Sequence, residues 1–362
     1  MTGRHKGPSV LVIKNRAIGD TILLTGSLRL LRQHLPRHEI HVLVRAPAGE
    51  LLVGLPYVDR IISAKEPAGG IDRIAYWTRL IQRLRVTHYD FTLNFHASMR
   101  SSLTARCLRA SIRVANHHEL RGRNWFSDLK VPGRGKVKPV IERDLDVLRA
   151  IGIHATVADA LPEVVLSPAE IQEAKSLFEN RPAAAKGGMR IFLGIGGSRA
   201  TKRWPAAHMI RLLEKLEKEC DAQFVMSTVA TDRHWLESFL PQLKRHPSLE
   251  KRLVHFENFS LRQTAKVVSQ CSLYVGNDSG LKHLAVALGL KTVTVFGPEA
   301  PLEWHPYSVD KHPYLFIPEL SCRTVGGKHW CAIPVCKQHQ HRCMQDIEPE
   351  QVFQKITEVL RC

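Results

Sequence analysis

Three short stretches of the chain place polar residues directly after an apolar run and directly before a second run with helical spacing. The first is KNRAIGD, which ends at Asp20; the second is GIGGSRATK, which ends at Lys202; the third is GNDSG, residues 276–280. In a strand–turn–helix unit such residues lie at the carboxyl end of the strand, where unpaired N–H groups and the helix dipole favour an anion. The chemistry expected of these turns is the binding of an anionic group.

The second turn carries the widest set of anion-binding groups. Three glycines within residues 194–197 allow close approach of the backbone, Ser198 and Thr201 offer hydroxyls, and Lys202 offers a point charge. A pyrophosphate needs this combination of groups at a helix start. The turn is not a Walker A loop, because the G-x-x-x-x-G-K-[ST] spacing is absent.

The acidic and hydroxyl residues of the other two turns have a second interpretation. Asp20 stands at the expected start of one helix, and Asp278 and Ser279 stand at the start of another. Short polar side chains at such positions often accept hydrogen bonds from the first N–H groups of the helix. The turns alone leave helix capping and ligand binding open.

Strand and helix patterns alternate along both halves of the chain. Strands are expected at residues 10–15, 40–44, 60–63, 91–95, 112–115, 191–196, 222–228, 253–256, 273–277 and 292–298. Helices are expected from about residue 20, across 71–85, from 99, across 140–151, from 205, 231, 261 and 279, and across 349–360. The alternation predicts an α/β protein with parallel sheets covered by helices on both faces. We expect two doubly wound domains, residues 1–160 and 161–345, and a C-terminal helix in 346–362, with a ligand in the cleft between the domains.

Composition agrees with a globular protein. The 362 residues are 44% hydrophobic and 24% charged, which is ordinary for folded domains. No apolar run approaches the roughly 18 residues of a membrane span, and no apolar signal region precedes the first strand. These features predict a soluble, cytoplasmic protein.

The charge is strongly positive, with 52 Lys and Arg against 34 Asp and Glu, a formal net charge of +18. Such a field attracts nucleic acid, anionic lipid surfaces or phosphorylated small molecules. Residues 98–138 hold ten Lys and Arg against two acidic residues. This stretch is either a docking surface for an anionic partner or a solvated basic face. A nucleic-acid-binding protein is the alternative from another class, but aromatic residues make up only 7% and no RNP-like motif is present.

Taken together, the segments KNRAIGDTILLTGSLRLLR, GGSRATKRWP and GNDSGLKHLAVALGLKTVTVFGPEAPLEWHP resemble, in order and spacing, the lipopolysaccharide heptosyltransferases. These are glycosyltransferase family 9 enzymes of GT-B fold, with two Rossmann-like domains that face each other across a cleft. The resemblance covers nearly the whole chain and implies inverting transfer of a heptose from ADP-heptose to the inner core of lipopolysaccharide. It further implies no catalytic metal, an anionic glycolipid acceptor at the inner leaflet, and a place at the cytoplasmic face of the inner membrane.

The resemblance also implies roles for single residues. Asp20 matches the general base on the acceptor hydroxyl, and Lys14 a basic residue near the acceptor. The implied donor-site residues are Ser198, Thr201, Lys202, Asp278, Ser279, Gly280 and His283. Among these, Ser198 and Lys202 would contact phosphate, Asp278 the sugar hydroxyls, and His283 is either a donor contact or a packed helix residue. Within the basic stretch, Arg100, Arg121 and Arg123 are expected to bind the acceptor.

Four cysteines, Cys322, Cys331, Cys336 and Cys343, fall within one loop near the C-terminus. Their spacing lacks the paired C-x2-C of zinc ribbons, and disulfides are not expected in a reducing cytoplasm. A structural Zn or Fe ion and unbridged thiols are both open. The loop also keeps open a related activity within the family, heptose transfer to Ser or Thr hydroxyls of a protein.

Overall fold

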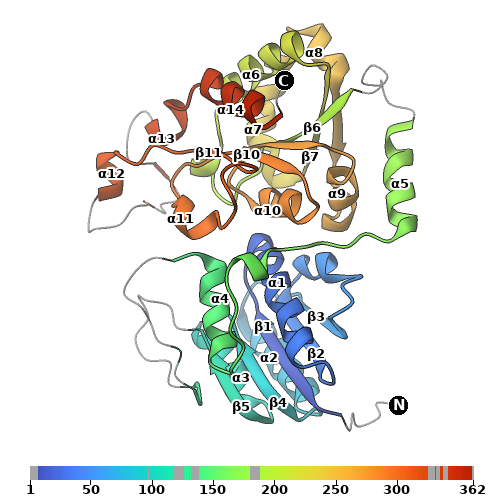
Figure 1. Cartoon of the computed structure of the whole chain (residues 1–362), viewed down its shortest axis with the longest axis vertical. Coiled ribbons are helices and arrows are strands. Elements are labelled where there is room, and N and C mark those ends of the chain that lie inside the picture. The colour runs from blue at the N-terminus through green and yellow to red at the C-terminus, as the bar shows by residue number, and fades with distance from the viewer. Residues whose placement is uncertain are drawn as a thin grey trace. The chain divides into compact units, whose positions relative to one another are not determined.

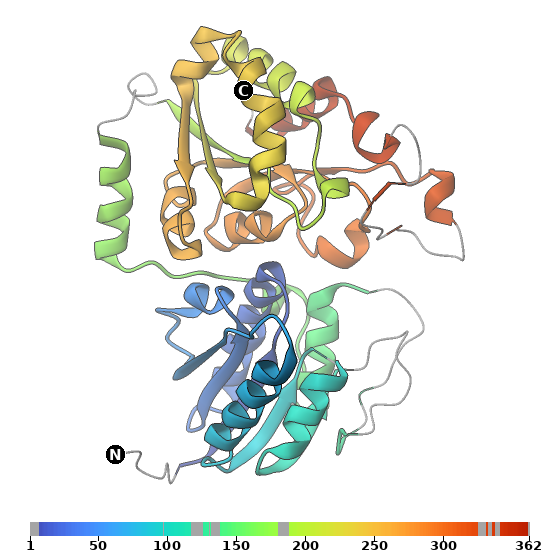
Figure 2. The ribbon, with the colours of Figure 1, turned by 180° about the vertical axis from the view of Figure 1, so that it is seen from behind.

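The computed structural model describes residues 7–96, 98–116, 126–129, 131, 138–179, 188–324, 331, 335–336 and 341–360. The chain divides into two compact units, Met1–Val165 and Leu166–Cys362. Each unit contains one β-sheet whose paired strands run parallel (Figures 1 and 2). Within the described residues, no helix is both long and apolar enough to cross a membrane.

The sheet of the first unit has the strand order β3-β2-β1-β4-β5. Its strands are β1 (Ser9–Lys14), β2 (Glu39–Arg45), β3 (Arg60–Ala64), β4 (Tyr89–Asn94) and β5 (Ala110–Ala115). Its helices are α1 (Ile18–His34), α2 (Gly70–Leu84), α3 (Met99–Cys107) and α4 (Val140–Arg149), with the short helices η1 (Ala48–Leu52) and η2 (Ala158–Ala160). All six residues of β1 are buried, because helices cover both faces of a central parallel strand.

The two faces of this sheet carry different helices. Leu11 and Ile13 of β1 belong to one buried cluster with Leu84 of α2 and Ala105 of α3. The helices α1 and α4 pack against each other and lie in front of the sheet in Figure 1, whereas α2 and α3 lie in front in Figure 2. Because β1 is the central strand, its C-terminal residues and the turn that leads to Asp20 lie in the middle of the row formed by the carboxyl ends of the strands.

The sheet of the second unit has the order β11-β10-β9-β6-β7-β8. Its strands are β6 (Met189–Gly194), β7 (Ala222–Thr228), β8 (Leu253–Glu257), β9 (Leu273–Asn277), β10 (Lys291–Val295) and β11 (Tyr314–Leu315). Its helices are α5 (Pro168–Glu179), α6 (Ala206–Glu219), α7 (Arg233–Leu243), α8 (Pro247–Arg252), α9 (Leu261–Val268), α10 (Gly280–Ala287), α11 (Pro301–Trp304), α12 (Ser321–Thr324), α13 (Arg342–Gln345) and α14 (Pro349–Leu360), with η3 (Ala200–Lys202) and η4 (Ala230–Asp232). The main core lies between the sheet and α6, α7 and α14. Strands β6 and β9 are neighbours at its centre, so the second and third polar turns start side by side.

The predicted α/β architecture is confirmed, and β7, β9 and α14 have the predicted limits. The helix starts differ at all three polar turns: α1 begins at Ile18, Pro205 precedes α6 as its N-cap residue, and Ser279 precedes α10 in the same way. The pattern did not predict α5, since Ala174 and Phe178 are its only buried residues, nor the two-residue strand β11.

The segments on either side of the unit boundary are each fixed to their own unit. Before it, Arg29 of α1 donates to the carbonyls of Asp159 (3.1 Å) and Leu161 (3.2 Å) and pairs with Glu163 (3.0 Å). The hydroxyl of Thr25 accepts a hydrogen bond from the Glu163 N–H at 2.9 Å. The segment 159–163 is therefore tied to α1 through both side chains and backbone.

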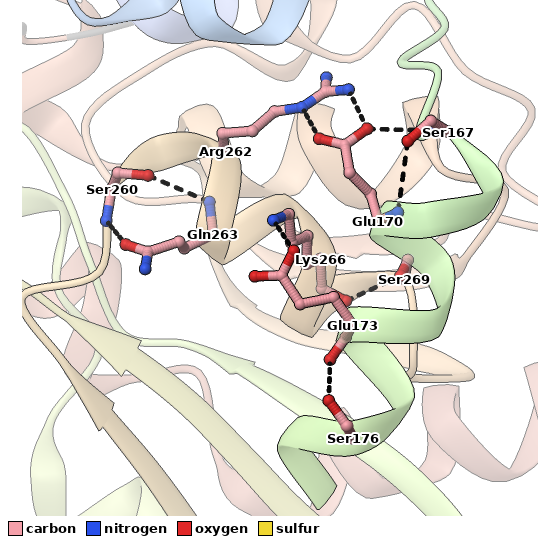
Figure 3. Close-up of polar contacts among 9 residues, drawn as sticks. All are labelled: Ser167, Glu170, Glu173, Ser176, Ser260, Arg262, Gln263, Lys266 and Ser269. Carbon is pink, nitrogen blue, oxygen red and sulfur yellow. Dashed lines mark hydrogen bonds and ion pairs between the residues drawn. The ribbon is translucent and has the colours of Figure 1, made fainter.

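After the boundary, α5 is tied to α9 by two ion pairs (Figure 3). Arg262 donates to both carboxylate oxygens of Glu170 at 2.7 Å, and Lys266 pairs with Glu173 at 2.5 Å. The hydrogen bond from Arg262 lowers the pKa of Glu170 to about 2 despite partial burial. Residues 164–166 connect the two segments.

Candidate active site

Asp20 is a buried carboxylate in the first turn of α1. It is the third residue of the helix, its side chain is 2% exposed, and the N-cap position is held by Ala17 without a side-chain cap. Arg16 Nε lies 3.4 Å from Asp20 Oδ1, and that oxygen has no hydrogen-bond partner among the described residues. The capping interpretation of Asp20 is therefore wrong. A buried carboxylate oxygen without a hydrogen-bond donor is suited to accept a proton or a hydroxyl hydrogen bond.

Lys14, the last residue of β1, is buried beside Asp144 of α4. Its Nζ lies 2.6 Å and 2.9 Å from the two carboxylate oxygens. Burial raises the pKa of Asp144, the Lys14 charge opposes that rise, and the Asp20 charge adds to it. The structure thus places Asp20 and the Lys14–Asp144 pair in one electrostatic environment. The ammonium of Lys14 is engaged with Asp144, so acceptor binding by Lys14 stays a prediction.

A cavity of about 840 Å³ opens within the first unit at the carboxyl ends of β1 and β2. Arg100, at the start of α3, lines it together with Arg73 and Trp77 of α2. Glu66 pairs with Arg100 at 2.5 Å and with Arg73 at 3.6 Å. The Nε1 of Trp77 and the Oδ1 of Asn15 are buried here without a hydrogen-bond partner among the described atoms. Arginines, an aromatic ring and polar atoms without hydrogen-bond partners are groups that bind an anionic sugar. The other two acceptor candidates, Arg121 and Arg123, lie outside the described residues.

The second turn is fastened to the third by Asn277, the last residue of β9. Its amide donates to the carbonyl of Ile195 at 2.7 Å, and its Oδ1 accepts from the Trp204 N–H at 2.9 Å. Gly194 and Gly276 pass so closely that a Cβ on Gly276 would lie 2.3 Å from the Gly194 carbonyl oxygen. Gly276 also has φ = 152°, which only glycine adopts readily. These contacts fix the two turns as one unit.

Asp278 lies between two lysines. Its Oδ2 is 2.8 Å from Nζ of Lys202, and its Oδ1 is 2.6 Å from Nζ of Lys282. Burial alone would raise the pKa of Asp278, but the charges of Lys282 and Lys202 hold that pKa well below its ordinary value. The aspartate is therefore ionised, and it aims Lys202 from the second turn toward the third.

The N-terminus of α10 adjoins this charge cluster. Ser279 occupies the N-cap position without a side-chain cap, and α10 begins at Gly280. The Ser279 hydroxyl instead lies 3.3 Å from the Tyr274 hydroxyl. Capping by the Ser279 side chain is wrong for this structure, and the first N–H groups of a helix have no partners within the helix. The end of α10 therefore offers N–H donors beside Lys202.

The remaining donor candidates occupy different surroundings. Ser198 is exposed on the second turn, whereas Thr201 is buried in η3. His283 is buried in α10, and its Nδ1 lies 2.6 Å from the Tyr307 hydroxyl. Burial keeps the pKa of His283 well below its ordinary value, so this imidazole is neutral at pH 7. The packed-residue interpretation of His283 fits this geometry.

The profile of glycosyltransferase family 9 (heptosyltransferase) matches residues 77–322. The chain belongs to this family. Lipopolysaccharide heptosyltransferase 2 of Escherichia coli K12 is 26% identical over 360 residues, covering 97% of this chain and 98% of the relative. The solved structure of E. coli ADP-heptose lipopolysaccharide heptosyltransferase II superposes with a TM-score of 0.75 at 23% identity, over 98% of this chain and 99% of that one. The chain is thus a glycosyltransferase of GT-B fold, and the nucleic-acid-binding alternative is set aside.

One structurally similar protein is described as containing a metal. The iron-containing dodecameric glycosyltransferase TibC of enterotoxigenic E. coli superposes with a TM-score of 0.57 at 14% identity, over 98% of this chain and 76% of that one. Here Cys322, Cys331, Cys336 and Cys343 are unbridged thiols. Among the described residues, no three His, Cys, Asp or Glu side chains are grouped to hold a metal ion. Burial, opposed by Arg323, raises the pKa of Cys343 to about 12, so that side chain is a neutral thiol as it stands.

Several site residues had no predicted role, among them Lys282, Asn277 and Asp144. The i, i+4 spacing of Asp278 and Lys282 was a sequence signal for the ion pair of Lys282. The contacts of Asn277 had no such signal, because they depend on the order of strands in the sheet. Glu66 belongs with them, because its pairing with Arg100 joins segments 34 residues apart.

Proposed function

We propose that the enzyme transfers a heptose from ADP-heptose to the inner core of lipopolysaccharide, with inversion at the anomeric carbon. The observation that carries the proposal is the meeting of Lys202, Asp278 and the start of α10 in one member of the heptosyltransferase family. The names of the relatives support both substrates: one acts on lipopolysaccharide, and the other is described with ADP-heptose.

The donor chemistry assigned to the second unit is stabilisation of the leaving diphosphate. Cleavage of the anomeric bond adds negative charge to the diphosphate in the transition state. Lys202 and the N–H groups of Ser279 and Gly280 would meet that charge with a cation and fixed dipoles. Ser198 and Thr201 would add hydroxyl contacts. Asp278, held by two lysines, would contact the sugar only through lone pairs that the lysines leave available.

The acceptor chemistry is assigned to the first unit. Asp20 would take the proton from the attacking hydroxyl, since its Oδ1 has no competing hydrogen bond in the described structure. The cavity beside Arg100, Arg73 and Trp77 would hold an anionic sugar of the acceptor, with Arg121 and Arg123 contributing further positive charge. Inversion requires the base and the leaving group on opposite sides of the anomeric carbon, and the two groups come from different units.

The proposed setting is the cytoplasmic face of the inner membrane, with the protein bound peripherally to its glycolipid acceptor. The positive net charge supports contact with an anionic leaflet. Sedimentation with vesicles of the acceptor glycolipid, at low and high salt, tests this setting. A bound fraction that does not exceed that on neutral vesicles would contradict it.

The proposed chemistry needs no metal, and a structural metal at the cysteine loop is a separate question. TibC supports iron as the candidate ion, but the four thiols of this chain would have to come together and lose protons first. Metal analysis of the purified protein, beside a variant with Cys331 and Cys336 changed to Ser, tests for such an ion.

The donor is tested by thermal shift against ADP-, UDP-, GDP- and CMP-sugars. Because a ligand that binds only the folded state stabilises it by RT ln(1 + [L]/Kd), ADP-heptose should raise Tm most. Mass spectrometry of a heptose-free inner-core acceptor should then show one added heptose. Selective stabilisation by another nucleotide sugar would contradict the donor, and labelling of a protein hydroxyl instead of the glycolipid would favour the related activity.

A further inference from the structure

Lys282 is a fully buried lysine next to the donor site that the mechanism above leaves without a task. Its side chain is 0% exposed. Nζ lies 2.6 Å from Asp278 Oδ1 and donates to the carbonyl of Trp304 at 2.9 Å. It also stands 4.5 Å from the centre of the Phe296 ring. Burying an ammonium costs several kcal/mol unless partners compensate it, and here an anion, a carbonyl and an aromatic face do so.

The charges around Lys282 do not cancel. Lys282 and Lys202 contribute two positive charges, and Asp278 contributes one negative charge, which leaves one positive charge in the cluster. The neighbouring aromatic and imidazole side chains add none. Burial lowers the pKa of His305 to about 3 and of His312 to about 4, keeps that of His283 well below its ordinary value, and raises that of Tyr307. A cluster with one net positive charge beside the first turn of α10 favours the binding of an anion, which would neutralise that charge.

We propose that Lys282 is a positioning residue of the donor site, which fixes Asp278 through one oxygen so that the other oxygen holds Lys202 toward the donor diphosphate. The inference rests on the proposed function and adds a residue to it. With Lys282 neutral, Asp278 would have Lys202 as its one cationic partner. The carboxylate would then draw Lys202 more strongly and make it less available to phosphate.

The same geometry couples donor binding to pH. Burial lowers the pKa of Lys282 to about 8, although Asp278 opposes the shift. A bound diphosphate favours the protonated ammonium, so binding takes up a proton at pH values above about 8. Affinity for ADP should therefore be constant below pH 7.5 and fall as pH rises from 8 to 9.5.

The test is calorimetric ADP binding from pH 7 to 9.5 for the wild type, Lys282→Met and Lys282→Arg. Methionine keeps length and apolar contacts but removes the charge. We expect ADP to bind Lys282→Met roughly tenfold more weakly at pH 7, within the 5–150-fold range of coupled sites, and with little change up to pH 9.5. Lys282→Arg, which keeps a charge, should restore part of the affinity and lose the fall above pH 8. Lys291→Met, which removes a lysine bonded to the Val359 carbonyl, serves as the matched control and should bind ADP as the wild type does.

The outcomes separate this inference from the function on which it rests. A wild type that fails to bind ADP at any pH overturns the proposed function and the inference together. Equal ADP affinity and equal pH dependence in the wild type and Lys282→Met overturn the inference alone. If Lys282→Met does not fold, the wild-type titration decides: an ADP affinity that stays constant from pH 7.5 to 9.5 overturns the role of Lys282.

Discussion

Asp20 has a buried carboxylate oxygen with no hydrogen-bond donor among the described residues, which is unfavourable for stability and useful to a base. Its Oδ1 faces Arg16 at 3.4 Å, beyond a good hydrogen bond. The carboxylate is also held on a helix rather than on a mobile loop. Both features fit a group that must receive a proton in a fixed position.

Replacing Asp20 by Asn should therefore remove catalysis and spare binding. We expect kcat to fall by roughly 10²–10⁴-fold, the range for lost general acid–base catalysis, because the amide keeps the shape but cannot accept the proton. ADP affinity and Tm should barely change. Steady-state kinetics with calorimetry check this; a kcat close to that of the wild type would leave Asp20 without a catalytic role.

Lys202 should control donor affinity. Lys202→Ala removes a point charge from the diphosphate and leaves Asp278 paired with Lys282 only, so ADP should bind more weakly by roughly 1.5–3 kcal/mol, the value of a hydrogen bond to a charged group. Calorimetry with ADP measures the change directly. Arg203→Ala, which removes the neighbouring partner of Asp232, is the matched control. Unchanged ADP affinity in Lys202→Ala would refute the phosphate assignment.

At this scale the sequence predicted positions that follow from a strand–turn–helix unit, whereas the roles of the residues there stay predictions. Asp278 and Ser279 directly follow β9, Lys202 ends η3 after β6, and Asp20 lies in the first turn of α1. It failed where a role depends on tertiary neighbours. The capping interpretation of Asp20 failed because α1 starts two residues earlier, and Lys282 gained its role through burial against Phe296 and Trp304.

Among the elements, α1 packs closely against η2 and needs a glycine at the contact. A Cβ built on Gly26 would lie 2.1 Å from the carbonyl oxygen of Ala160 in η2. Gly26→Ala should therefore displace residues 158–163 and lower the free energy of unfolding by about 1–3 kcal/mol, the usual cost of overpacking, in spite of alanine's better helix propensity. Urea denaturation measures it, with exposed Gln33→Ala of the same helix expected within about 0.5 kcal/mol of wild type. A stabilised Gly26→Ala would show that η2 moves freely.

The tie between α5 and α9 should be pH-dependent. Glu170 has a pKa of about 2 in the folded state against 4.5 ordinarily, so its contribution is complete above pH 5 and is lost as pH falls from 4.5 through about 2. Glu170→Gln should lower the free energy of unfolding by about 1 kcal/mol at pH 7, a value discounted for solvent screening, and by progressively less below pH 4. Glu173→Gln, at the more exposed pair, is the control with a smaller effect. Equal losses at pH 7 and pH 3 would contradict the assignment.

Elements were predicted well where burial is deep and poorly where it is shallow. The strands β7 and β9 are buried throughout, and their apolar runs marked their limits. By contrast, α5 buries two side chains and depends on Arg262 and Lys266, which are distant in sequence. No local pattern encodes such a partner.

For the whole molecule, the net charge of +18 should act on the anionic acceptor. Neutralising Arg121 and Arg123 to Ala should raise the acceptor KM and leave the donor KM unchanged, more strongly at low salt because screening is weaker there. Kinetics at two ionic strengths check this. Arg233→Ala with Arg245→Ala, two exposed changes of equal charge in the second unit, form the control. If the acceptor KM is unchanged in the Arg121 and Arg123 variant, the two arginines do not bind the acceptor and belong to a solvated basic face.

The clamped ends of the connection between the units also limit how the enzyme can move. Arg29 holds residues 159–163 to α1, and Arg262 holds α5 from Glu170 onward. Three extended residues span only about 10 Å. Whatever the enzyme does during turnover, residue 163 and the start of α5 therefore stay joined by a short stretch of chain, and a wider separation at this point would have to break the contacts of Arg29 or Arg262.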